Sequence, residues 1–177
     1  FDGSRKPLQQ NIDETAAIAE MAHAAGISCE GEIGFVGYSG GEASNGTDPA
    51  EAAKFSRDSG VDAMAISVGN VHLQQDKEGG LDLTRIAEIE AMTSIPLVIH
   101  GGSGVPVAQR TLLSAQTSIC KFNIGTELRL AFGAALRKAV ASHPDRFDRV
   151  QILVDTIDPV QIAAQRVLSA FGAPPQR

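Results

Sequence analysis

The chain has 177 residues, 43% of them apolar and 5% aromatic, and a formal charge of −6 at pH 7. This length suffices for a single domain over residues 1–177 with a substantial core, and the acidic balance argues against a general nucleic-acid binder. Cys29 and Cys120 lie far apart with no CxxC pair, so we expect a cytoplasmic protein rather than a disulfide scaffold. No apolar run reaches the roughly 18 residues that cross a bilayer, so no membrane partner is expected.

Apolar periodicity and glycine or proline stops divide the chain into alternating helices and strands. The predicted helices are 11–25, 47–59, 83–93, 107–116, 126–142 and 159–171. The predicted strands are 27–33, 61–68, 95–99 and 119–124, with 1–4 as the end of an earlier strand and 35–45 as a mobile loop. Strand–helix units in series indicate a parallel sheet with right-handed crossovers.

A closed (β/α)8 TIM barrel takes about 250 residues, which is more than this chain contains. We therefore expect either the C-terminal half of such a barrel or a smaller doubly wound sheet. The half-barrel would run from the end of strand 4 to strand 8 and continue into the C-terminal helices. The chain begins at Phe1 inside what resembles a strand end, which suggests that an N-terminal portion precedes it.

The stretch from Ile95 to Gly104 combines a buried strand, a histidine and a glycine-rich turn. His100 stands at the carboxyl end of the strand, where parallel α/β folds keep their chemistry. Gly101-Gly102-Ser103-Gly104 follows, just before Pro106, a favourable first residue of a helix. Unobstructed backbone N–H groups at such a turn favour an anion, usually a phosphate.

The predicted strand ends bring further polar residues to the same edge of the sheet. They are Asp2, Glu30, Glu32, His72, His100 and Asn123. His72 and His100 follow consecutive strands, so their imidazoles could share a zinc ion, with Glu32 or a residue before Phe1 as a third ligand. In the simpler alternative, the histidines only form hydrogen bonds, and one of the two glutamates pairs with a lysine.

A second candidate phosphate element is Asn123-Ile124-Gly125-Thr126, where the last strand meets a long helix and Thr126 is a plausible N-cap. TIM-barrel enzymes frequently bind phosphate through the loops after strands seven and eight. If 95–99 is strand seven and 119–124 is strand eight, the chain supplies both loops.

At these residues the chain resembles the class II, metal-dependent ketose-bisphosphate aldolases of the fructose- and tagatose-bisphosphate aldolase family. The matching segments run collinearly through most of the chain: Phe1-Asp-Gly-Ser4, Cys29-Glu-Gly-Glu-Ile-Gly34, Thr47-Asp-Pro-Ala-Glu-Ala52, Val68-Gly-Asn-Val-His72, Leu97-Val-Ile-His-Gly-Gly-Ser-Gly104 and Ile119-Cys-Lys-Phe-Asn-Ile-Gly-Thr-Glu-Leu128.

The resemblance implies a lyase of carbohydrate metabolism, active in glycolysis, that cleaves a ketose bisphosphate of the fructose or tagatose type into dihydroxyacetone phosphate and glyceraldehyde 3-phosphate. It further implies zinc on His72 and His100, a second metal position at Asp2 and Glu32, and a mobile catalytic acid at Glu42. The phosphate would lie against residues from two segments, with a sodium or potassium ion nearby: Gly101, Gly102, Ser103, Asn123, Ile124, Gly125 and Thr126. Assembly into a homodimer or homotetramer is also expected.

Three departures from the family pattern are visible. The Asp-His-Gly motif, which supplies the main catalytic acid and a third zinc histidine, would lie before Phe1, so residues 1–177 alone should be inactive. Leu73 stands where many members have Gly, and Gly125 replaces a common Asp or Ala, which leaves substrate choice open. Two alternatives are a metal-free sugar-phosphate isomerase or synthase and a non-catalytic sugar-phosphate-binding homologue. Schiff-base chemistry is less attractive because Lys121 lies within a strand.

Overall fold

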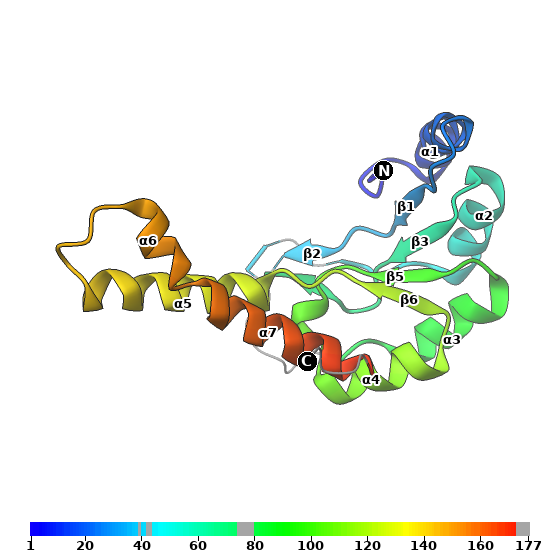
Figure 1. Ribbon diagram of the computed structural model, residues 1–177. Helices are drawn as coiled ribbons and strands as arrows, with labels where there is room; N and C mark the ends of the chain where they lie inside the picture. The colour runs from blue at the N-terminus through cyan, green and yellow to red at the C-terminus, as the bar shows by residue number, and fades with distance from the viewer. Residues whose placement is uncertain (39, 42–43, 74–79, 173–177) are drawn as a thin grey trace. The chain divides into compact units, whose positions relative to one another are not determined.

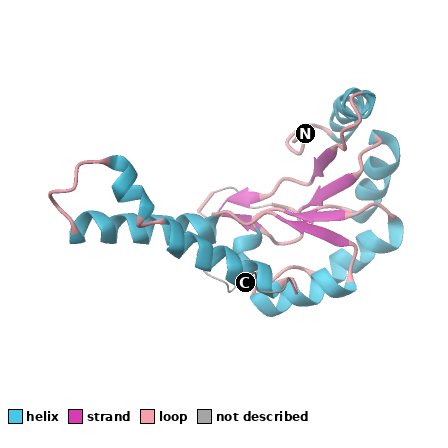
Figure 2. Cartoon of the chain, viewed as in Figure 1, coloured by secondary structure: helices cyan, strands magenta, loops and turns pink. Residues whose placement is uncertain are grey.

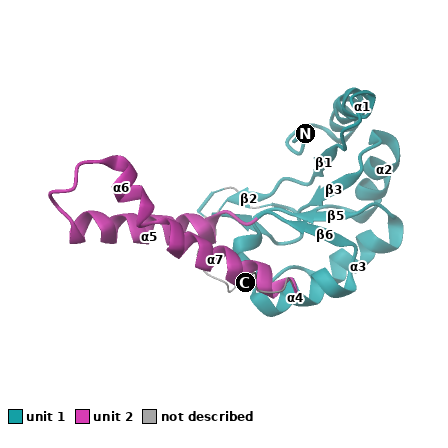
Figure 3. Cartoon of the chain, viewed as in Figure 1, with its two compact units in different colours: residues 1–123 teal, residues 124–177 magenta. Residues whose placement is uncertain are grey.

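The computed structural model describes residues 1–38, 40–41, 44–73 and 80–172. The chain divides into two compact units, Phe1–Asn123 and Ile124–Arg177, coloured separately in Figure 3. Each unit is described by itself below.

The first unit is built on a four-stranded parallel sheet whose strands follow one another in chain order (Figures 1 and 2). The strands are β1 (Glu30–Ile33), β3 (Ala63–Ile66), β5 (Leu97–Ile99) and β6 (Ile119–Phe122). The helices are α1 (Leu8–Ala24), α2 (Pro49–Ser59), α3 (Leu83–Met92) and α4 (Val107–Gln116), and Figure 1 shows them one after another around the outside of the sheet. The order does not reverse as it would at the switch point of a doubly wound sheet, which agrees with the barrel alternative.

The core between the sheet and these helices explains why the strands form where they do. The strands carry short apolar runs with fully buried side chains, among them Met64, Ile66, Leu97 and Ile99. Gly31 admits the ring of Phe55 from α2, because a Cβ on Gly31 would lie 2.8 Å from a ring atom. Side chains alternate along a strand, so Glu30 and Glu32 project to the face opposite α2.

The helix boundaries follow local capping chemistry. Asp48 accepts hydrogen bonds from the N–H groups of Ala50 and Glu51, and this caps α2 at the predicted position. Gly60, with φ +68°, ends the same helix in the left-handed conformation that glycine tolerates.

A second, two-stranded parallel sheet pairs β2 (Gly37–Tyr38) with β4 (Val71–His72). The prediction of residues 35–45 as a loop throughout was therefore wrong at Gly37 and Tyr38. Neither two-residue strand has an apolar pattern of its own. Each forms because the other supplies its backbone partners. The predicted strand 61–68 is likewise shorter, with β3 ending at Ile66.

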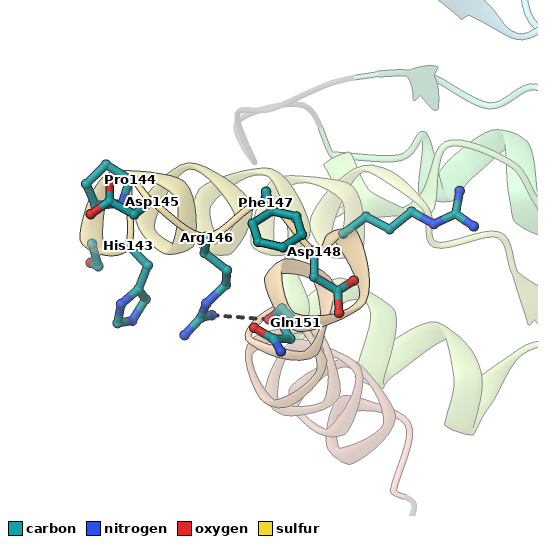
Figure 4. A pocket seen from close by; sticks show the side chains of 9 residues that line it. His143, Pro144, Asp145, Arg146, Phe147, Asp148 and Gln151 are labelled. Carbon is teal, nitrogen blue, oxygen red and sulfur yellow. Dashed lines mark hydrogen bonds between the residues drawn. The ribbon is translucent and has the colours of Figure 1, made fainter.

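The second unit consists of α5 (Thr126–Ser142), α6 (Arg149–Val154) and α7 (Ile157–Ala170), with α6 and α7 packing against α5. We did not predict α6, whose six residues give little periodicity, although Asp148 caps it by accepting from the N–H of Val150. Residues 142–149 and 151 line a hollow of about 810 Å³. Figure 4 shows its side chains and the hydrogen bond that Arg146 donates to the carbonyl of Gln151. The hollow contains none of the predicted site residues. Among the described helices, none has the length and apolar character that a membrane crossing requires.

Candidate functional site

A cluster of acidic and imidazole side chains brings together residues of β1, of β4 and of the end of β5 in the first unit. Its members are Asp2, Glu30, Glu32, His72 and His100. Asp2 is bridged to Glu32 through the backbone, and His100 follows β5 directly. Glu30 is the first residue of β1, so its predicted position at the carboxyl end of the strand was wrong. The alternation of side chains indicates on which face of β1 Glu30 lies, but it does not indicate how far along the strand this residue stands.

His100 is the centre of this cluster, because both of its ring nitrogens contact carboxylates. Its Nδ1 lies 2.9 Å from Glu32 Oε2, and its Nε2 lies 3.1 Å from Glu30 Oε1. The side chain of Glu32 is buried, with 8% of its surface exposed, and that of His100 is partly buried, with 15% exposed. The hydrogen bond with Glu32 raises the pKa of His100 despite the opposing effect of burial, and the Glu32 and Glu30 charges add to the increase.

Glu30 links His100 to Lys121 of β6. The ammonium of Lys121 donates to Glu30 Oε2 at 2.6 Å. Burial by itself would raise the pKa of Glu30, but the hydrogen bonds from Lys121 and His100 outweigh it and lower this pKa. The sequence-based alternative in which one glutamate pairs with a lysine thus holds for Glu30, while Glu30 also contacts the histidine.

His72 is the second imidazole of the cluster and differs from His100 in its electrostatics. The two ring centroids are 6.0 Å apart at an interplanar angle of 46°, and the Tyr38 ring lies 4.9 Å from that of His72. Burial and the positive charge of His100 lower the pKa of His72. The pKa values of the two histidines are therefore shifted in opposite directions.

The residue types of this cluster fit a divalent cation, since imidazole and carboxylate are the common ligands of zinc. His100 Nδ1 and Glu32 Oε2 already face each other at a separation close to the roughly 3.3 Å between two ligands of one tetrahedral zinc ion. Within the described ranges, no three His, Cys, Asp or Glu side chains form a complete metal site. Groups of the types that bind zinc therefore lie together among the described residues, without forming a complete ligand set.

Asn70 is a supporting residue that sequence reasoning did not single out. This buried side chain accepts from the N–H of Val68 and donates to the carbonyls of Ile66 and His100, at 3.2 and 3.0 Å. It therefore joins the end of β3 to the backbone of His100. A polar residue two positions before His72, directly after a buried strand, was the available signal.

The glycine-rich turn packs directly against β4. Gly101 has φ +63°, and a Cβ there would lie 2.5 Å from the carbonyl oxygen of Val71. Only glycine meets both conditions, because other residues disfavour this conformation and would also collide with backbone. The turn thereby sets the spacing between His100 and the strand that carries His72.

The turn is more closed than the sequence suggested. Residues Gly102–Gly104 form a buried 3-10 turn, and the N–H groups of Gly102, Gly104 and Val105 donate to backbone carbonyls. These N–H groups, expected to be unobstructed, are thus already engaged. The fully buried guanidinium of Arg110, also missed from the sequence, donates to the carbonyl of Val105 at 2.8 Å.

The second predicted phosphate element spans the boundary between the units along the chain. Asn123 belongs to the first unit, where its N–H donates to Ile99 and its carbonyl accepts from Gly102. Thr126 begins α5 in the second unit, and the N-cap is Gly125, so the prediction of Thr126 as N-cap was wrong by one residue. Gly125 provides no side chain to the first turn of α5, whose N–H groups are the ones a bound anion would favour. The predicted catalytic Glu42 lies outside the described residues.

Comparisons with known proteins identify the family to which the chain is similar. The family model for fructose-bisphosphate aldolase class-II matches residues 1–175. The fructose-bisphosphate aldolase of Geobacillus stearothermophilus is 33% identical over 98% of this chain and 61% of its own length. The 6-phospho-5-dehydro-2-deoxy-D-gluconate aldolase of Shouchella clausii is 35% identical over 98% of this chain and 60% of its own length.

Solved structures agree in fold. The YdjI aldolase of Escherichia coli K12 superimposes with a TM-score of 0.74 at 28% identity, covering 97% of this chain and 58% of that one. A putative fructose-1,6-bisphosphate aldolase of Coccidioides immitis gives a TM-score of 0.78 at 20% identity, over 97% and 61% of the two chains. The chain thus spans about 60% of the length of these relatives and forms part of a TIM barrel. It belongs to the class II fructose-bisphosphate aldolase family.

Proposed function

We propose that the protein containing this chain is a metal-dependent aldolase that cleaves a ketose 1,6-bisphosphate into dihydroxyacetone phosphate and glyceraldehyde 3-phosphate. The observation that carries the proposal is the cluster of His72, His100 and Glu32 in a chain that matches the aldolase family over residues 1–175. Carbon–carbon cleavage next to a ketone needs stabilisation of the developing enediolate, and a fixed positive charge provides it.

His72, His100, Glu32 and Asp2 are the residues that would hold zinc in this proposal. The ion would act as a Lewis acid on the substrate ketone oxygen. His72 is suited to the role because its lowered pKa keeps the ring neutral, as a ligand must be. Glu42 is the proposed acid that moves the substrate proton, and the main catalytic Asp is expected in sequence before Phe1.

The phosphate group would anchor the non-reacting end of the substrate and thereby orient the ketone. We assign this role to two segments, Gly101–Ser103 and Asn123–Thr126, with a sodium or potassium ion nearby. The N–H of Gly102 in the first segment and that of Asn123 in the second already donate to backbone carbonyls. The first-turn N–H groups of α5, which a helix leaves without intrahelical partners, are therefore the donors that we expect the phosphate to use. Backbone donors of this kind suit a dianionic phosphate even in an acidic chain.

The proposal leaves fructose and tagatose bisphosphates as the candidate substrates. A relative named for 6-phospho-5-dehydro-2-deoxy-D-gluconate shows that similar chains are associated with other phosphorylated substrates. Leu73, directly after His72, is the residue of this chain at which we expect substrate choice to differ. We further propose a cytoplasmic homodimer or homotetramer.

The test is an aldol-cleavage assay of the full-length protein, with fructose and tagatose 1,6-bisphosphates as substrates and bound zinc measured in parallel. His100→Ala should remove the zinc and lower the cleavage rate by at least about 1000-fold, since a Lewis-acid contribution is worth several kcal/mol. His143→Ala, in the second unit, is the matched control and should retain both.

Unchanged zinc content and cleavage in His100→Ala would contradict the proposal. Activity that persists in a chelator would instead favour a metal-free isomerase or synthase. Sugar-phosphate binding without cleavage would favour a non-catalytic homologue.

A further inference from the structure

Glu30 occupies a position that the proposed metal ligands leave unexplained. Its carboxylate has two oxygens with different partners, because Oε1 faces Nε2 of His100 and Oε2 accepts from Lys121. The Lys121 contact, at 2.6 Å, is the shorter of the two and comes from β6, at the other edge of the sheet from β1. Glu30 is therefore held on one side by a fixed charge while it contacts the histidine on the other.

This arrangement makes the two nitrogens of His100 unequal. Nε2 faces Glu30, which contacts Lys121 and which we have not assigned to metal binding. Nδ1 faces Glu32, whose backbone is paired with that of Asp2 in an isolated β-bridge. An imidazole ring cannot present both nitrogens to one ion, so the contact with Glu30 selects which nitrogen is left for a ligand role.

Histidine ligands in metalloproteins usually donate their second ring N–H to a carboxylate or carbonyl, which orients the ring and increases the basicity of the ligating nitrogen. Glu30 meets the requirements of such a partner, because it is a carboxylate, lies 3.1 Å from Nε2 of His100 and is held in place by Lys121. Its side chain is 28% exposed, more than the 8% of Glu32, as expected for a group outside the ligand set.

We propose that Glu30 is a positioning residue for His100, held by Lys121, and that it keeps Nε2 protonated so that Nδ1 serves as the metal ligand. This inference rests on the proposed function, since it assumes that His100 binds a divalent metal. Beyond the proposed function, the inference names the ligating atom of His100 and gives roles to Glu30 and Lys121.

A purely structural role for Glu30 makes a different prediction. If the Lys121–Glu30 ion pair only stabilised the sheet, its removal would lower the unfolding temperature and leave zinc affinity unchanged. A partly exposed ion pair contributes little to stability, because water screens its charges. Metal affinity is therefore the quantity that separates the two roles.

The experiment titrates zinc alone into the full-length protein and into four variants of it by calorimetry, with the thermal midpoint recorded for each. Glu30→Ala should weaken zinc binding by about 10–100-fold. Glu30→Gln should lose less, because its amide oxygen still accepts from Nε2, and Lys121→Met should also lose less than Glu30→Ala. Glu14→Ala is the matched control, because Glu14 pairs with Lys6 at 2.5 Å on exposed α1 and should leave the affinity unchanged.

Histidine-selective nitrogen NMR of the zinc-loaded, unsubstituted full-length protein provides a second test that does not depend on any variant folding. We expect His100 to carry zinc on Nδ1 and a proton on Nε2. Zinc on Nε2, or equal zinc affinity in Glu30→Ala and the unsubstituted protein, would overturn the inference about Glu30 alone. No saturable zinc binding by the unsubstituted full-length protein would overturn the inference together with the proposed metal site.

Discussion

Replacing Gly101 by alanine tests the packing of the glycine-rich turn against β4, which brings His100 and His72 together. At φ +63°, a left-handed alanine costs about 1–2 kcal/mol. The new Cβ would also lie 2.5 Å from the carbonyl oxygen and 2.7 Å from the carbonyl carbon of Val71. An ordinary contact needs roughly 3.4 Å, so β4 or the turn must move by about 0.9 Å, and such overpacking costs about 1–3 kcal/mol more.

Gly60→Ala is the matched control, because Gly60 has φ +68° but no atom within 4 Å of its added Cβ. Both residues lie in the first unit, and both substitutions restrict the unfolded chain equally. Urea unfolding should therefore show Gly101→Ala to be less stable than Gly60→Ala by about 1–3 kcal/mol. Zinc affinity should fall only in Gly101→Ala, because only that change displaces the strand of His72. Equal losses of stability in the two variants would refute the reasoning.

Three further predictions concern single residues of the first unit. Asn70→Ala should lower the free energy of unfolding by about 2–4 kcal/mol in urea titrations, because it leaves buried backbone partners unpaired, and a loss below 1 kcal/mol would contradict this. Hydrogen bonds from the N–H of Cys29 and from a histidine lower the pKa of Asp62, so its stabilising effect is present at neutral pH and disappears as the pH falls through that lowered pKa. The stability gap between the unsubstituted chain and Asp62→Asn should close on acidification, and a gap independent of pH would exclude this origin. Leu73→Gly should leave stability unchanged or raise it by up to about 1 kcal/mol, because Leu73 has φ 58°, whereas a loss above 1 kcal/mol would show that the side chain packs favourably.

Much of the candidate site followed from local sequence. His100 and His72 were found because an apolar run ending in histidine marks the end of a buried strand, and parallel strands bring such ends together. The regular alternation of strands and helices predicted the parallel sheet, and the choice of the half-barrel came from the family resemblance. These features depend on neighbouring residues, so periodicity is sufficient to find them.

The partners of His100 depend on register and distance across the sheet, which local sequence does not contain. Glu30 and Lys121 are 91 positions apart, and their contact follows from the stagger of strands at opposite edges of the sheet. The hydrogen bonds that engage the N–H groups of the turn at Gly102 could not be predicted from the sequence for a related reason. Glycine content indicates conformational freedom, but the turn is shaped by the carbonyl of Asn123 and by buried Arg110.

The most direct measurement for the account is anomalous diffraction at the zinc edge from crystals of the zinc-loaded, full-length protein. The account predicts one peak about 2.0–2.1 Å from a ring nitrogen of both His72 and His100, because imidazole–zinc bonds have that length. A peak that contacts neither ring, or only one of them, would contradict the claim that these two histidines share the catalytic metal.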